Sequence, residues 1–183
     1  MTTEAASIIS ATQRWLEAAV IGLNLCPFAK AVHVKKQIRY VVSAAATPEA
    51  LLENLLAELR ILQDADPEKI DTTLLIHPYV LNDFLDFNDF LDMVDIVTAE
   101  PEFNDEFQVA SLHPRYQFAG TAPDDIENYT NRSPYPTLHL LREASVDRAV
   151  AAFPDADQIV DNNIETMKKL GHEGWQRLRL DVL

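Results

Sequence analysis

Glycine and cysteine are scarce in this chain, and long apolar runs are absent. Its 183 residues include four glycines and a single cysteine, Cys26. So few glycines leave little room for a phosphate-cradling loop, and no GxGxxG, Walker, GxSxG or kinase pattern occurs. One cysteine excludes an intramolecular disulfide and a CxxC redox pair. Because a secretory signal is also missing, a cytoplasmic location is expected. No apolar segment approaches the roughly 20 residues of a membrane span.

Positive charge is also in short supply. The chain has 15 basic and 29 acidic residues, which gives a net charge of −14. Such an acidic protein repels phosphate backbones and anionic lipid surfaces, so we expect neither nucleic acid nor membrane among its partners. An anionic substrate would need a locally positive pocket. The 48% share of apolar residues is sufficient for a hydrophobic core.

Hydrophobic periodicity predicts alternating helices and strands. The expected strands cover 35–44, 72–77, 106–113 and 137–142. The expected helices cover 4–23, 47–62, 82–99, 145–152 and 154–171. Thr47 before Pro48 is a typical helix start, Ser145 is expected to cap the fourth helix, and Gly171 is expected to stop the last one.

This order predicts an α/β fold, with α+β as the alternative: a single domain whose mixed sheet of about four strands is flanked by helices. An N-terminal helix (4–23) would precede an α/β core (35–170), and a C-terminal tail (171–183) would follow it. In the helix 82–99 an aspartate recurs at every third position, so these side chains drift round the helix. They indicate a solvated face, or a surface for a partner, and the DxDxDG pattern of a calcium loop is absent.

The segment 111–143 is the most informative part of the sequence. It joins two predicted strands through a long connection with four prolines, and such connections are usually disordered or functional. Its aromatic residues argue against disorder. The side chains that we expect to bind a substrate there are Arg115, Arg132, Arg142, Asn131, Tyr116 and Tyr135. Arginine binds carboxylate or phosphate in bidentate fashion, but the arginines could instead pair with the acids at 124, 125 and 127.

Histidines follow or lie within three of the strands. His77-Pro78 and His113-Pro114 each end a strand, and if those strands are parallel both histidines emerge at the same carboxyl edge. If the fourth strand returns antiparallel, His139 arrives there too. The three would then suit a transition metal such as zinc or iron. Two alternatives stay open: the histidines bind or polarise an organic anion without metal, or they only cap strand ends and bond loop carbonyls.

Cys26 admits two interpretations. Next to a histidine or a helix N-terminus its thiolate would be a nucleophile. Between Leu25 and Phe28 it would instead be a buried structural residue.

The blocks GLNLCPFAK, SLHPRYQFAG and NRSPYPTLHLLRE together resemble a bacterial and plant family catalogued as domain of unknown function 1415. The resemblance covers nearly the whole chain and implies a single-domain family member. It implies no activity, cofactor or catalytic residue. The same blocks contain the candidates chosen above on physical grounds, among them Cys26, His113, Arg115 and Arg132.

Two functions follow from these observations. The first is an enzyme for a small anionic molecule or peptide group, with His113, His77 and Cys26 as catalytic candidates. Arg115 and Arg132 would hold the anion under the 111–143 loop. The second is a non-catalytic domain that uses the same loop to bind a ligand or a partner protein.

Overall fold

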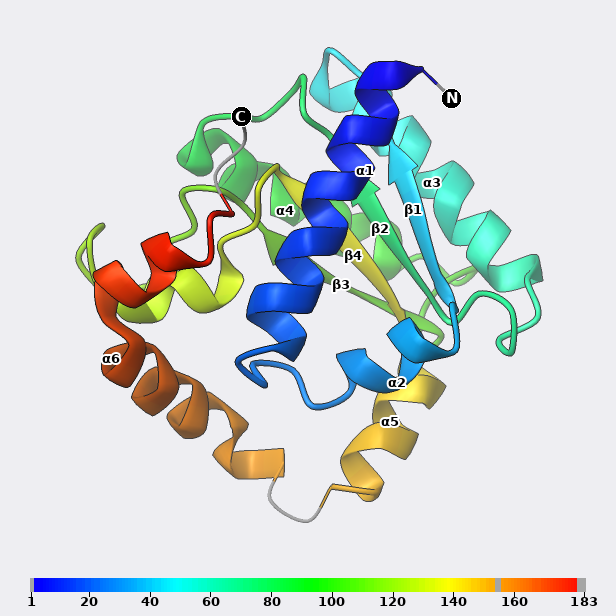
Figure 1. The fold of residues 1–183 in the computed structure, drawn as a ribbon. Coiled ribbons are helices and arrows are strands. Elements are labelled where there is room, and N and C mark those ends of the chain that lie inside the picture. The colour runs from blue at the N-terminus through cyan, green and yellow to red at the C-terminus, as the bar shows by residue number, and fades with distance from the viewer. Residues whose placement is uncertain (1, 154–155, 181–183) are drawn as a thin grey trace.

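A four-stranded mixed sheet forms the centre of the computed structural model, which describes residues 2–153 and 156–180 (Figure 1). The strand order is β1-β2-β4-β3. β1 and β2 run parallel, and β4 is antiparallel to both of its neighbours, β2 and β3. The strands are β1 (Ile38–Val42), β2 (Thr72–Ile76), β3 (Phe107–Leu112) and β4 (Thr137–Arg142). The predicted single α/β domain with a mixed sheet is therefore confirmed.

Helices cover both faces of this sheet (Figure 1). The main ones are α1 (Thr3–Trp15), which continues into the π-helical η1 (Leu16–Ile21), α3 (Pro48–Asp64), α4 (Phe84–Thr98), α5 (Glu143–Ala151) and α6 (Ile159–Arg177). Shorter ones are α2 (Ala29–Val34), η2 (Ile126–Asn131) and η3 (Ala156–Gln158). The α2 helix was not expected. Thr47 caps α3 as predicted, because its side chain accepts a hydrogen bond from the Ala50 N–H.

The expected cap at Ser145 is wrong. The α5 helix begins at Glu143, directly after β4, and its N-terminus has no side-chain cap. The Ser145 hydroxyl instead donates to Asp71 Oδ1 at 2.6 Å. A cap at Ser145 would require a short loop after β4, but β4 ends at Arg142 and α5 begins at the next residue.

Two apolar cores hold the layers together. On one face of the sheet, leucines of α3 and Phe87, Phe90 and Val94 of α4 pack on Leu75, Leu138 and Leu140. On the other face, Trp15, Leu16 and Ala19 pack against Ile38, Tyr40 and Leu112. All five residues of β2 are buried, as its apolar sequence predicted for a strand covered on both sides.

A break at Gly171 shapes the C-terminal region. Gly171 has φ 63° and ψ 175°, a backbone conformation that residues other than glycine rarely adopt, and the helix changes direction there. The last part of α6 then lies beside η2 (Figure 1), with Trp175 against Tyr129. Pro154 and Asp155, the expected start of the last helix, and residues 181–183 of the expected tail lie outside the described residues. Over the described ranges, no helix has the length and apolarity that crossing a membrane requires.

Candidate functional site

The carboxyl edge of the sheet brings His77 and His113 close together. They directly follow β2 and β3, which both run antiparallel to the β4 strand between them. The His77 N–H donates to the carbonyl of Pro136, and the His113 N–H to that of Asn131. Both rings pack against Phe87 of α4, with centroid distances of 5.5 Å and 5.2 Å. The shared edge expected for these two histidines is therefore present.

His139 does not join them. It pairs with Leu74 of β2 and Ala110 of β3, each three residues before the corresponding histidine. Because side chains alternate between the faces of a sheet, this odd offset places His139 on the opposite face. There its Nε2 lies 2.8 Å from the Thr72 hydroxyl. The expectation that all three histidines meet is wrong, and no cluster of three or more His, Cys, Asp or Glu side chains that could hold a metal exists among the described residues.

Hydrogen bonds fix the protonation of the paired histidines. The Arg115 N–H donates to His113 Nδ1 at 3.0 Å, so His113 Nε2 carries the proton and donates to the Leu81 carbonyl. His77 Nδ1 bonds the Val80 carbonyl at 3.1 Å, which leaves its Nε2 as a buried acceptor with no partner. Both residues are 0% exposed, and burial lowers the pKa of each to about 4. At neutral pH they are uncharged groups that tie the segment after β2 to the sheet.

Cys26 lies far from this pair. It follows η1, and the loop between η1 and α2 lies at the end of the molecule opposite the carboxyl ends of β1 and β2 (Figure 1). The side chain is partly buried, and burial raises the pKa of the thiol, although hydrogen bonds from the backbone of Phe28 and Ala29 act in the other direction. The structure therefore does not bring the three catalytic candidates into one site.

The three candidate arginines also separate. Arg115 donates to the Asn82 carbonyl and forms an exposed ion pair with Asp83, at 3.2 Å. Arg142 ends β4 at the amino edge of the sheet, where it bonds the carbonyls of Leu62, Ala65 and Ile70. The prediction that Arg142 binds a substrate together with the other residues of the loop is therefore wrong.

Arg132 has the most distinctive environment of the three. Its Nε donates to the Tyr116 carbonyl at 3.2 Å, and one terminal nitrogen donates to the Pro123 carbonyl at 2.6 Å. The guanidinium carbon lies 4.1 Å from the centre of the Tyr129 ring. In the described part of the chain Arg132 forms no ion pair, so its guanidinium contacts two carbonyls and an aromatic ring and is otherwise open to solvent.

The other loop candidates have structural surroundings. The Tyr116 ring packs between Phe84 and Phe118, at 5.3 Å and 5.0 Å. Asn131 bonds the Ser111 carbonyl, and burial raises the pKa of Tyr135. None of these three lines either of the two pockets described below.

Sequence reasoning missed Asn128, which organises the loop. Its side chain is fully buried, and its Oδ1 accepts hydrogen bonds from the Phe118 N–H and the Thr121 hydroxyl. Its Nδ2 donates to the Ala122 carbonyl at 2.8 Å. Asparagine is common in loops, so its type alone carried no signal of this role.

A cleft of about 290 Å³ opens between the loop and the two chain ends. Arg132 lies in its wall, and so do the tryptophans of α1 and α6, which the sequence did not lead us to expect there. Tyr129 packs edge-on against Trp175 at 5.2 Å. The lining residues are Trp15, Pro114, Tyr129, Arg132, Ser133, Pro134, Trp175 and Leu180. One cation, three aromatic rings and two prolines thus surround the cleft.

Residues 7–177 match the model of a family described as "Protein of unknown function (DUF1415)". The match spans nearly the whole chain and includes every residue of the cleft except Leu180. No curated protein matches the chain, and no solved structure does. The family description names no activity, so a function has to be argued from the geometry.

Proposed function

We propose that this chain, which belongs to the DUF1415 family, binds a small organic anion with an apolar body in the Arg132 cleft. The observation that carries the proposal is the charge of Arg132, which lies over the Tyr129 ring, forms no ion pair with a described residue and lines the same cleft as the two tryptophans. This is the non-catalytic alternative that the loop sequence suggested, now assigned to a particular cleft.

The state of Arg132 supports an anionic ligand. Guanidinium groups favour planar, bidentate contacts with carboxylate or phosphate. Two loop carbonyls and the Tyr129 ring already hold this guanidinium in place, so little side-chain freedom would be lost on binding. A ligand carboxylate would supply the negative partner that no described residue provides.

The aromatic walls support an apolar body in the same ligand. Tyr129 and Trp175 are partly exposed and offer aromatic surface to the cleft, and Trp15, which is only 3% exposed and anchored in the core beside Leu16, supports them from behind. Trp175 is held by its edge-on contact with Tyr129. Ligand sites commonly combine such rigid apolar walls with a few polar groups that fix orientation.

Intrinsic fluorescence tests this proposal directly, because the chain has two tryptophans and both line the cleft. The protein would be titrated with benzoate and with its neutral analogue benzamide. We expect a saturable fluorescence change with benzoate at concentrations about tenfold below those needed for benzamide, which is the effect of one charge-assisted hydrogen bond.

Arg132→Gln should abolish the preference for benzoate. Arg115→Gln is the matched control, because Arg115 is an exposed arginine of the same loop that does not line the cleft. Equal binding of benzoate and benzamide, or no binding of either to the folded protein, would refute the proposal.

Catalysis by the histidine pair stays a prediction with less support. Its favourable observation is the unpaired lone pair of His77 Nε2, a potential base. Against it, both rings are fully buried and line neither the Arg132 cleft nor the pocket at the amino edge of the sheet. A His77→Asn variant that kept its fold but lost an activity found by substrate screening would revive the enzymatic alternative.

A further inference from the structure

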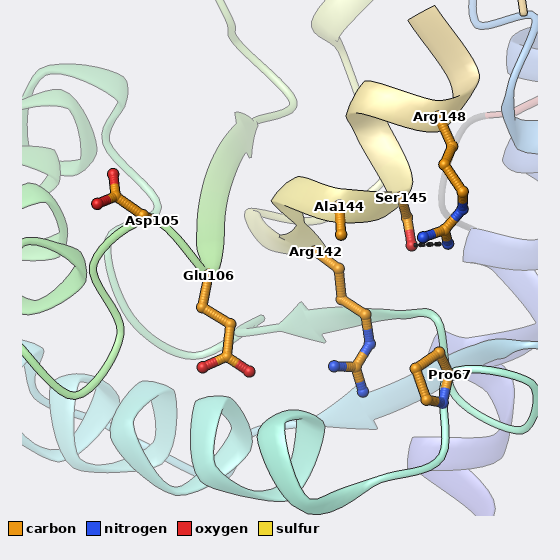
Figure 2. A pocket seen from close by; sticks show the side chains of 7 residues that line it. All are labelled: Pro67, Asp105, Glu106, Arg142, Ala144, Ser145 and Arg148. Carbon is orange, nitrogen blue, oxygen red and sulfur yellow. Dashed lines mark hydrogen bonds between the residues drawn. The ribbon is translucent and has the colours of Figure 1, made fainter. Parts of the chain in front are cut away.

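A second pocket lies at the amino edge of the sheet, opposite the histidine pair. Figure 2 shows it between the start of β3, the end of β4 and the first turns of α5. Its volume is about 170 Å³. The lining residues are Pro67, Asp105, Glu106, Arg142, Ala144, Ser145 and Arg148.

One side of this pocket is cationic. Arg142 is 8% exposed, and its Nε–H has no hydrogen-bond partner although the group is buried. Arg148 donates to the Ser145 hydroxyl at 2.9 Å. Neither arginine forms an ion pair with any residue that the structure describes. The uncapped N-terminus of α5 adds the positive end of its helix dipole beside them, because Ala144 and Ser145 belong to its first turn. Two carboxylates lie near this side as well, because Glu143 is in the same turn and Asp71 accepts a hydrogen bond from the Ser145 hydroxyl.

The opposite side is anionic. In Figure 2 the carboxylate of Glu106 faces the guanidinium of Arg142 across the pocket, whereas that of Asp105 turns away. Gln63 Nε2 donates to Glu106 Oε2 at 2.8 Å and so holds the carboxylate in place. Glu106 and Arg142 are thus opposite charges held apart by the protein, with room for another molecule between them.

We propose that this pocket binds a small zwitterion, specifically a small free α-amino acid. Its carboxylate would bind Arg148, Arg142 and the α5 N-terminus, and its ammonium group would bind Glu106. A phosphate or dicarboxylate would be repelled by Glu106, and a simple amine by the two arginines. The volume accommodates about six water-sized groups, which is the size of alanine.

Isothermal titration calorimetry of the full chain with L-alanine, in a buffer free of amines and carboxylates, tests the proposal. We expect saturable binding at one site per chain. Acetate and methylammonium each carry one of the two charges, and each should bind at least about tenfold more weakly than alanine. Tryptophan fluorescence should stay unchanged, because both tryptophans line the cleft at the other edge.

Two variants test which residue binds the carboxylate of alanine and which binds its ammonium group. Arg148→Gln should weaken alanine binding about tenfold by removing the carboxylate contact, and Glu106→Gln should do so by removing the ammonium contact. Arg60→Gln is the matched control, because Arg60 is an exposed arginine paired with Glu102 and lies outside the pocket. Arg148 is exposed, so its replacement keeps the fold even if Glu106→Gln disturbs it.

Three results would overturn the proposal. They are the absence of saturable alanine binding, acetate or methylammonium binding as tight as alanine binding, and alanine binding that Arg148→Gln leaves intact. Acetate binding alone would make the pocket an anion site.

Discussion

The buried histidines predict that the protein loses stability in mild acid. His77, His113 and His139 each have a pKa of about 4 in the folded chain, lowered mainly by burial. In the unfolded chain they would titrate near 6.5. Because the folded pKa is the lower one, the unfolded state binds more protons between these values. The free energy of unfolding should therefore be constant above pH 6.5 and fall as the pH drops toward 4.

The size of the effect follows from the fully buried His77. A pKa lowered from 6.5 to about 4 corresponds to about 3 kcal/mol of stability lost once the pH is below both values. His113 is equally buried, and protonating either ring opposes protonation of the other. Small domains have a total stability of roughly 5–15 kcal/mol, so these two groups alone could bring the chain to its unfolding transition.

Urea unfolding followed by circular dichroism between pH 8 and pH 4.5 measures this dependence. His77→Asn is the informative variant, because its amide can still donate to the Val80 carbonyl. It should lower stability at pH 7, through lost ring packing on Phe87, but reduce the acid-dependent loss by up to about 3 kcal/mol. A stability that is flat between pH 6.5 and 4.5, or NMR titration of the His77 ring near 6.5, would refute the reasoning.

Two further predictions concern Cys26 and Asn128. Burial raises the pKa of the Cys26 thiol, so at pH 7 it should react with a disulfide reagent more slowly than free cysteine; faster reaction would restore the nucleophile hypothesis. Asn128→Ala should lower the free energy of unfolding by about 3 kcal/mol in urea titrations, because it leaves buried loop groups without partners. The exposed Asn88→Ala is the control, and equal losses in both variants would contradict the role of Asn128.

The fold was largely predictable because local patterns and tertiary packing agree. The unbroken apolar run of β2 indicated a strand covered on both sides, and Thr47 before Pro48 located the start of α3. Where a local signal competed with a tertiary one, the prediction failed. Ser145 has the residue type of a helix cap, but its hydroxyl bonds Asp71, and the helix starts two residues earlier.

Part of the site error could have been avoided from topology alone. The chain reaches the amino end of β1 at Ile38, soon after Cys26, which argued against placing Cys26 with His77 at the carboxyl edge. An antiparallel β4 that begins near His113 must end at the far edge, which removes Arg142 from the loop. Topology could not predict on which face of the sheet His139 lies. That face depends on the register of β4, which no short motif specifies.

The cleft could not be predicted, because it depends on contacts between distant segments. Trp15 faces it only because of how α1 docks on the sheet, and Trp175 only because α6 breaks at Gly171. Gly171 was recognised as a helix stop, but a positive φ does not reveal where the chain goes next. The loop supplied Arg132, and the ends of the chain supplied the aromatic walls.

Two arginines of this chain are held in position by hydrogen bonds to backbone carbonyls. Carbonyls and neutral side chains hold the loop together: His113 donates to the Leu81 carbonyl, Asn128 bonds three loop groups, and two carbonyls accept hydrogen bonds from the cationic Arg132. An ion pair is therefore not needed to keep Arg132 in position, and its charge stays available. The same holds at the other edge, where three carbonyls position Arg142 and leave it without an acidic partner among the described residues. Because isolated buried charges are costly, the buried Arg142 favours an anionic partner from outside the chain, and the partly exposed Arg132 keeps its charge accessible to one.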